Sequence, residues 1–119
     1  RSRRGASSTE SKSPNRQRIS SMKRLVITID ASRDLSEISD YFLEQSIDAG
    51  DRFVEGFGKK CQHLAEFPYL GRSYAQFVPG LRGIPLMDYI IFYQIVGEGI
   101  EILRVISGYR NLQTVFHKN

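Results

Sequence analysis

The sequence contains few of the side chains that form disulfides and metal sites. Its 119 residues include one cysteine, two histidines and no tryptophan. A single cysteine excludes an intramolecular disulfide, and Cys61, His63 and His117 lack the ligand spacing of a zinc site. Cys61 falls among the apolar positions of a predicted helix, which favours a buried small side chain over a nucleophile. We expect neither a metal nor any other cofactor.

Long apolar runs are also missing. No segment approaches the roughly 18 consecutive apolar residues that cross a bilayer, and the N-terminal residues lack the apolar centre of a secretory signal. The 119 residues, 40% of them hydrophobic and 25% charged, suffice for one globular domain and are too few for two ordinary ones. We therefore expect a soluble, cytoplasmic protein with one modest core and no membrane contact.

The formal charge of +4 is distributed unevenly. Residues 1–21 hold six basic side chains and one acidic one, whereas residues 22–119 hold 11 basic and 12 acidic side chains. A general nucleic-acid-binding domain would ordinarily carry a clustered basic face. The nearly neutral charge of residues 22–119 argues against that function.

Residues 1–21 are rich in serine and arginine and almost free of apolar side chains. Such a segment cannot bury enough surface to offset the entropy of ordering it, so we expect it to be disordered. Its composition resembles an organelle transit peptide, but it lacks the apolar face of one. We interpret residues 22–119 as the folded domain beginning at Met22, and residues 1–21 as an upstream extension. A basic arm that contacts nucleic acid is the alternative.

The pattern after Met22 predicts a strand followed by two amphipathic helices. Residues 23–29, KRLVITI, form a β-branched run typical of a strand. Two apolar stripes at helical spacing follow: Leu35, Ile38 and Phe42, then Phe53, Phe57, Cys61 and Leu64. We expect Asp30 or Ser32 to cap the first helix and Asp48 to cap the second. The two helices would form an αα-hairpin.

Three strand-like runs follow a loop that proline and glycine punctuate. They are residues 81–86, 89–96 and 100–107, and the GEG sequence between the last two signals a tight hairpin. The predicted fold class is therefore α+β, with an N-terminal strand, an αα-hairpin and a three-stranded antiparallel meander packed on the helices.

Both faces of the last two strands are expected to be largely apolar. One face would hold Ile90, Phe92, Gln94, Glu101, Leu103 and Val105. The other would hold Tyr89, Ile91, Tyr93, Ile95, Ile100, Ile102, Arg104 and Ile106. Because an αα-hairpin covers only one face, the other needs the C-terminal segment, a second copy or a partner protein to cover it.

Several short motifs occur in a familiar order: FPYLGR, GLR, YIIFY, EILRVISGYR and a closing VF. Together with the element order, they resemble the ParE/RelE family of bacterial type II toxins over residues 22–116. The resemblance implies growth inhibition and a hetero-oligomer with a cognate antitoxin that wraps the toxin, so that DNA is contacted only through the antitoxin. An antitoxin would occupy the uncovered sheet face, with Ile90, Phe92, Tyr93 and Leu103 as candidate contacts.

The family has two functional branches, which differ at two positions. RelE-type members cleave mRNA on the ribosome and resemble this chain except that they have an arginine where Ile90 stands and a tyrosine where Phe116 stands. Transesterification needs proton transfer and cations to stabilise the developing charge, which neither Ile90 nor Phe116 supplies. The chain therefore resembles the ParE branch, whose members inhibit DNA gyrase, and we predict no catalytic residues. A RelE-like endonuclease with a rearranged site, or a non-toxic co-repressor, are the alternatives.

The candidate target-binding residues are Arg110, Arg82 and Phe116. Arg110 either contacts the target or forms a salt bridge with Glu66 or Asp88. Arg82 and Arg72 flank the long loop and could instead fix it by bonding its carbonyl groups. Arg104 is interpreted as structural, paired with a carboxylate or a tyrosine hydroxyl. Finally, the tail is expected to fold back onto the sheet through Leu112, Val115 and Phe116.

Overall fold

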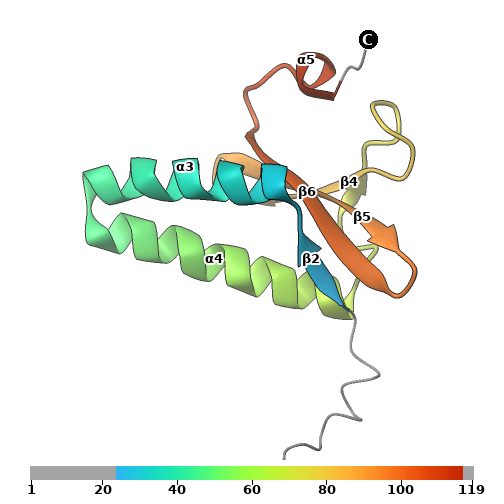
Figure 1. Cartoon of the computed structure of the whole chain (residues 1–119), viewed down its shortest axis with the longest axis horizontal. Coiled ribbons are helices and arrows are strands. Elements are labelled where there is room, and N and C mark those ends of the chain that lie inside the picture. The colour runs from blue at the N-terminus through green and yellow to red at the C-terminus, as the bar shows by residue number, and fades with distance from the viewer. Residues whose placement is uncertain (1–23, 117–119) are drawn as a thin grey trace, which may run out of the picture.

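The computed structural model describes residues 24–116 as an αα-hairpin packed on a mixed sheet (Figure 1). The predictions for residues 1–21, for the start at Met22 and for His117 lie outside these residues. The elements are β2 (Leu25–Ile27), α3 (Ile29–Gln45), α4 (Ile47–Glu66), β3 (Arg72–Ser73), β4 (Arg82–Leu86), β5 (Tyr89–Val96), β6 (Gly99–Ser107) and α5 (Leu112–Phe116).

The five strands are ordered β2-β6-β5-β4-β3. The β4–β5–β6 meander is antiparallel, as predicted, and Val96 faces Gly99 across a two-residue hairpin loop. The predicted α+β fold is thus confirmed. Two features were not predicted: β2 joins the sheet beside β6 in parallel, and β3 adds a two-residue edge strand to β4.

Both helices begin earlier than predicted. The N-cap of α3 is Thr28, whose side chain accepts a hydrogen bond from the Ala31 amide at 3.1 Å. The N-cap of α4 is Ser46, which accepts one from the Ala49 amide at 2.9 Å. The prediction of Asp30, Ser32 or Asp48 was wrong, because the chain leaves its extended conformation at Thr28 and Ser46 and a capping side chain must lie just outside the helix.

The helices cover one face of the sheet. The buried residues of this layer are Ala31, Ile38, Phe53, Leu64, Ile84, Leu86, Ile91, Tyr93, Ile100, Ile102 and Val105. The rings of Phe42 and Phe53 stack with centroids 5.5 Å apart, which joins the two helices. Cys61 is buried on α4, as predicted.

A β-bulge in β6 changes the predicted alternation. Phe92 faces Arg104 and Tyr93 faces Ile102, so Leu103 has no opposite residue on β5. Beyond the bulge each side chain exchanges faces, because one extra residue inverts the two-residue period. Val105 therefore packs under the helices and Ile106 on the opposite face. The predicted faces of these two residues were wrong, whereas those of the other apolar residues of the hairpin are confirmed.

The chain itself covers part of the second face. Leu81, Phe92 and Ile106 are buried there beneath a loop that includes Phe77 and the tail that ends in Phe116. The Phe116 ring lies edge-on to Phe92, with centroids 4.9 Å apart. The prediction that Leu112, Val115 and Phe116 fold back onto the sheet is confirmed. Of the three expected coverings, the C-terminal segment is therefore present, and in Figure 1 α5 lies away from the αα-hairpin.

Within residues 24–116, no helix combines the length and the apolar character that a membrane span requires.

Candidate functional site

The loop after α4 is held by Arg82. The Arg82 guanidinium donates hydrogen bonds to the Gly71 carbonyl at 2.7 and 3.0 Å and to the Tyr69 carbonyl at 3.2 Å. It also lies over the Tyr69 ring, 5.2 Å from the centroid. The interpretation that Arg82 fixes the loop through its carbonyl groups is confirmed. This leaves Arg82 less free to act as a target contact.

Tyr93 holds the same loop from inside the core. Its hydroxyl donates to the Pro68 carbonyl at 2.7 Å and accepts from the Gly71 amide at 2.9 Å. A Cβ atom on Gly71 would lie 2.5 Å from this hydroxyl oxygen, so the position requires glycine. Tyr93 is fully buried, and so is Phe92 on the opposite face. In this conformation neither presents surface to an antitoxin, although both were candidate contacts.

The other two candidate antitoxin contacts are half-buried. Ile90 and Leu103 both pack against the second layer of the core with the tail. From the resemblance, Ile90 and Phe116 were expected to stand where the RelE branch has an arginine and a tyrosine. Both are apolar and packed here, so neither position can transfer a proton or stabilise an anion. Burial also raises the pKa of Cys61 to about 11, which keeps the thiol protonated near neutral pH.

Asp34 on α3 joins the helix to the bulged part of β6. Its carboxylate accepts from the Arg104 guanidinium at 2.7 and 3.1 Å and from the Val105 amide at 2.9 Å. The hydrogen bond to Asp34 is the main cause that raises the pKa of Arg104. The prediction that Arg104 pairs with a carboxylate is confirmed. The choice of Asp34 could not be predicted, because it depends on the bulge that turns this part of β6 toward α3.

Arg110 lies just after the turn that ends β6. Its amide donates to the Ser107 carbonyl at 3.0 Å, and the residue is exposed. Between residues 24 and 116 the structure forms one ion pair, Arg104 with Asp34, so Arg110 pairs with neither Glu66 nor Asp88. It lines a cavity of about 240 Å³ between α3 and the sheet. Polar groups of this cavity come from Asp34, Glu37, Tyr41, Tyr89 and Ser107.

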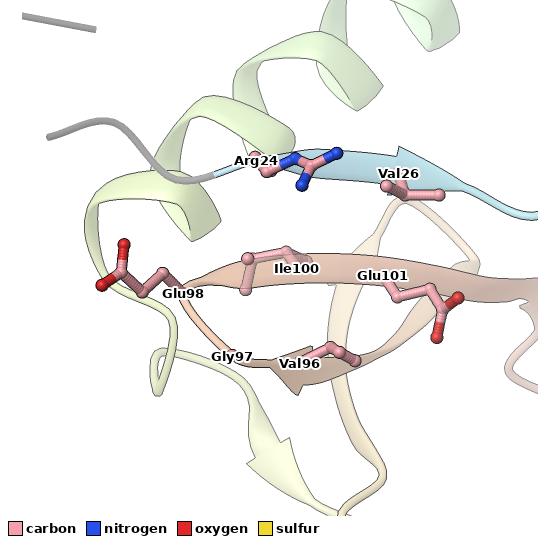
Figure 2. A pocket seen from close by; sticks show the side chains of 8 residues that line it. Arg24, Val26, Val96, Gly97, Glu98, Ile100 and Glu101 are labelled. Atoms are coloured by element: carbon pink, nitrogen blue, oxygen red, sulfur yellow. The ribbon is translucent and has the colours of Figure 1, made fainter. Parts of the chain in front are cut away.

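Part of the second sheet face is left open at the β2 edge. The strand register places Val26, Glu101 and Val96 on the same face as Phe92, beyond the covering tail. Figure 2 shows these side chains on three neighbouring strands. They line a groove of about 430 Å³, in which Val26 is 47% and Val96 55% exposed. Glu101 accepts a hydrogen bond from Gln94 at 2.8 Å, and Glu98 lies in the adjoining hairpin loop. Arg24 also lines the groove, so charged groups of both signs surround its apolar side chains.

Comparison with known proteins places the chain in one family. The family model described as ParE toxin of type II toxin-antitoxin system, parDE, matches residues 25–112. The chain is 28% identical over 92 residues to Toxin ParE3 of Caulobacter vibrioides, covering 76% of this chain and 92% of that protein. It is 36% identical over 92 residues to Putative toxin Y4kP of Sinorhizobium fredii, covering 76% of this chain and 93% of that protein.

A solved structure shares the fold. It comes from a chromosomal ParDE toxin–antitoxin system of P. aeruginosa and superposes with a TM-score of 0.62 at 23% identity, covering 73% of this chain and 97% of that chain. The match includes nearly all of that protein, so the likeness extends over the whole fold and not one motif. With the family model spanning most of the described residues, the chain belongs to the ParE toxin family of type II toxin–antitoxin systems.

Proposed function

We propose that this toxin inhibits DNA gyrase by binding to it, without catalysing a reaction, and that a ParD-type antitoxin neutralises it. The proposal rests on Ile90 and Phe116, the two positions expected to distinguish the RelE branch from the ParE branch. Ile90 and Phe116 are apolar and pack against the core, so no general acid or cation is available there. In contrast to these two apolar residues, Arg110 is charged, and it is exposed at the rim of a polar cavity.

Purified components can test this proposal directly. The toxin should inhibit supercoiling by gyrase in a concentration-dependent manner and should leave translated mRNA intact in a reconstituted translation reaction. Cleavage of mRNA in the second reaction, with no effect in the first, would replace the proposal with a RelE-like ribonuclease. Growth that is unharmed by expression of the toxin alone would point to a co-repressor.

For the antitoxin we propose the open groove at the β2 edge. An apolar side chain of the antitoxin would lie on Val26 and Val96, basic groups beside it would meet Glu98 and Glu101, and an acidic group would meet Arg24. This location replaces the four candidates on β5 and β6, because the chain itself covers Phe92, Tyr93 and much of the face around them.

Val26→Asp should weaken antitoxin binding by about tenfold or more, since it removes an apolar contact and introduces a carboxylate that must be desolvated when the antitoxin binds. Affinity for the cognate antitoxin, measured by calorimetry with far-ultraviolet circular dichroism as a folding check, tests this. Val54→Asp is a matched control, because Val54 is exposed on α4, away from the groove. Loss of affinity in the control alone would place the antitoxin on the αα-hairpin instead.

A further inference from the structure

The loop that Arg82 and Tyr93 hold presents large apolar side chains to solvent. Phe67, Tyr69 and Leu70 are consecutive but for Pro68, and Tyr69 is 71% exposed. Hydrogen bonds from both sides fix the backbone that carries them. Because the loop is already ordered, binding a partner to it costs less conformational entropy than binding to a flexible loop would. Exposed apolar groups in a preformed arrangement are typical of a protein-binding surface.

A groove begins beside this loop. It has a volume of about 340 Å³ and is lined by Leu70, Arg72, Tyr74, Pro85 and Ile90, among others. A second cavity of about 250 Å³ is lined by Pro85, Met87, Ile90 and Tyr109, with Asp88 and Gly108. The two cavities share Pro85 and Ile90, so they adjoin at these residues. We call the apolar residues along them, Leu70, Pro85, Ile90, Met87 and Tyr109, the docking strip.

Met87 has an unusual backbone for its residue type. It occupies the two-residue turn between β4 and β5 with a φ of 57°, and half of it is exposed. Asparagine and glycine are favoured at such a turn position, because other side chains are strained in the left-handed region. An exposed methionine there contributes a flexible apolar surface of the kind used in protein recognition. The retained strain is consistent with a binding role.

The docking strip has a cation at one end. Arg72 lies over the Tyr74 ring, 5.0 Å from its centroid, beside the first groove. Tyr109, which is 87% exposed, lies at the other end, and the next residue, Arg110, lines the cavity between α3 and the sheet. Asp88 lines the second cavity, so the positive charge that would attract an acidic residue is confined to the Arg72 end.

Backbone pairing does not explain the strip. β3 pairs only with Arg82 and Gly83, so the outer edge of β4 is open from Ile84 onward. By the alternation of strand hydrogen bonds, Pro85 faces this open edge, and it has no N–H to donate. A segment bound here would therefore be held through its side chains and not as an added strand.

We propose that the docking strip binds a segment of the toxin's target protein that carries apolar side chains beside an acidic residue. The apolar side chains would lie on Leu70, Ile90 and Met87, and the acidic residue would pair with Arg72. The assignment to the target rests on the proposed function, because the strip is continuous with the turn that presents Arg110. The target would thus contact the apolar docking strip in addition to Arg110.

Two variants test the strip, Arg72→Glu and Leu70→Ser, both at exposed positions outside the packed core. Each should raise the toxin concentration needed for half-inhibition of gyrase supercoiling by about tenfold or more, because one repels the acidic end and the other removes an apolar contact. Antitoxin affinity and the melting temperature should remain those of the wild type. Lys59→Glu, an exposed charge reversal on α4, should change none of these quantities.

The same variants separate this proposal from the identity of the target. If the wild type arrests growth without inhibiting gyrase, the proposed target is wrong, yet loss of growth arrest in folded, antitoxin-binding Arg72→Glu would still support the strip. Full inhibition by both variants would overturn the strip. Loss of antitoxin affinity would assign it to the antitoxin instead, and binding of a single-stranded RNA oligonucleotide that Arg72→Glu abolishes would assign it to nucleic acid.

Discussion

Asp34 shows how one residue connects two layers of this fold. Its carboxylate satisfies the Val105 amide, which lies beyond the end of β2 and has no strand beside it, and also orients the Arg104 guanidinium. Thr28, the N-cap of the same helix, acts similarly, because its hydroxyl donates to the Leu103 carbonyl at 3.1 Å. Both residues satisfy backbone groups of β6 that the short strand β2 does not reach.

Asp34→Ala should lower the free energy of unfolding by about 3 kcal/mol, since it leaves a buried amide and a half-buried guanidinium without their acceptor. Urea denaturation of the two proteins measures the difference. Asp40→Ala provides the comparison, as Asp40 is an exposed acid on the same helix, and its effect should be within about 0.5 kcal/mol. A loss below 1 kcal/mol for Asp34→Ala would mean that water replaces the carboxylate at little cost.

At the scale of elements, the sequence was sufficient for most of the architecture. The β5 strand agrees with its predicted range, and β4 and β6 agree within one residue, because β-branched runs end at glycine or at turn residues there. The bulge at Leu103 could not be predicted, because no glycine or other break marks this position and only pairing with β5 shows that Leu103 is the extra residue. The parallel place of β2 also depends on a contact between distant parts of the chain.

The roles of the candidate site residues were likewise predicted where local sequence sets them and missed where they depend on contacts between distant parts of the chain. Arg82, Arg104 and the tail had roles that local sequence indicates, namely carbonyl bonding, charge pairing and apolar packing. Phe92 and Tyr93, on opposite faces of β5, were both candidate antitoxin contacts because the sequence does not indicate which face of the sheet the helices cover. The groove at Val26 was missed because it exists only where β2 lies beside β6.

The β4–β5 turn offers a test at this scale. Met87→Asn should raise the free energy of unfolding by about 1 kcal/mol, because asparagine tolerates the left-handed conformation that strains methionine. The same variant should weaken inhibition of the target, because it removes apolar surface from the docking strip. Thermal denaturation and the supercoiling reaction together measure both effects. A more stable variant with full inhibitory activity would show that Met87 has no binding role.

The whole molecule carries its proposed partners on different surfaces. The antitoxin groove lies at the β2 edge of the second sheet face, whereas the docking strip runs from the loop after α4 to the turn after β6. The αα-hairpin supports the sheet from the other face, and α5 with the loop around Phe77 fills the centre of the second face. Variants on one surface should therefore leave the other function intact.

If the toxin binds gyrase through the Arg110 turn, as proposed, Arg110→Ala should inhibit supercoiling much more weakly than the wild type. Arg110 is exposed and its side chain forms no ion pair within residues 24–116, so the variant should fold and bind antitoxin as the wild type does. We expect Arg110→Ala to raise the toxin concentration needed for half-inhibition by about tenfold or more. Arg52→Ala, which changes an exposed arginine on α4, should inhibit as strongly as the wild type. A folded Arg110→Ala protein that inhibits gyrase as strongly as the wild type would contradict the account.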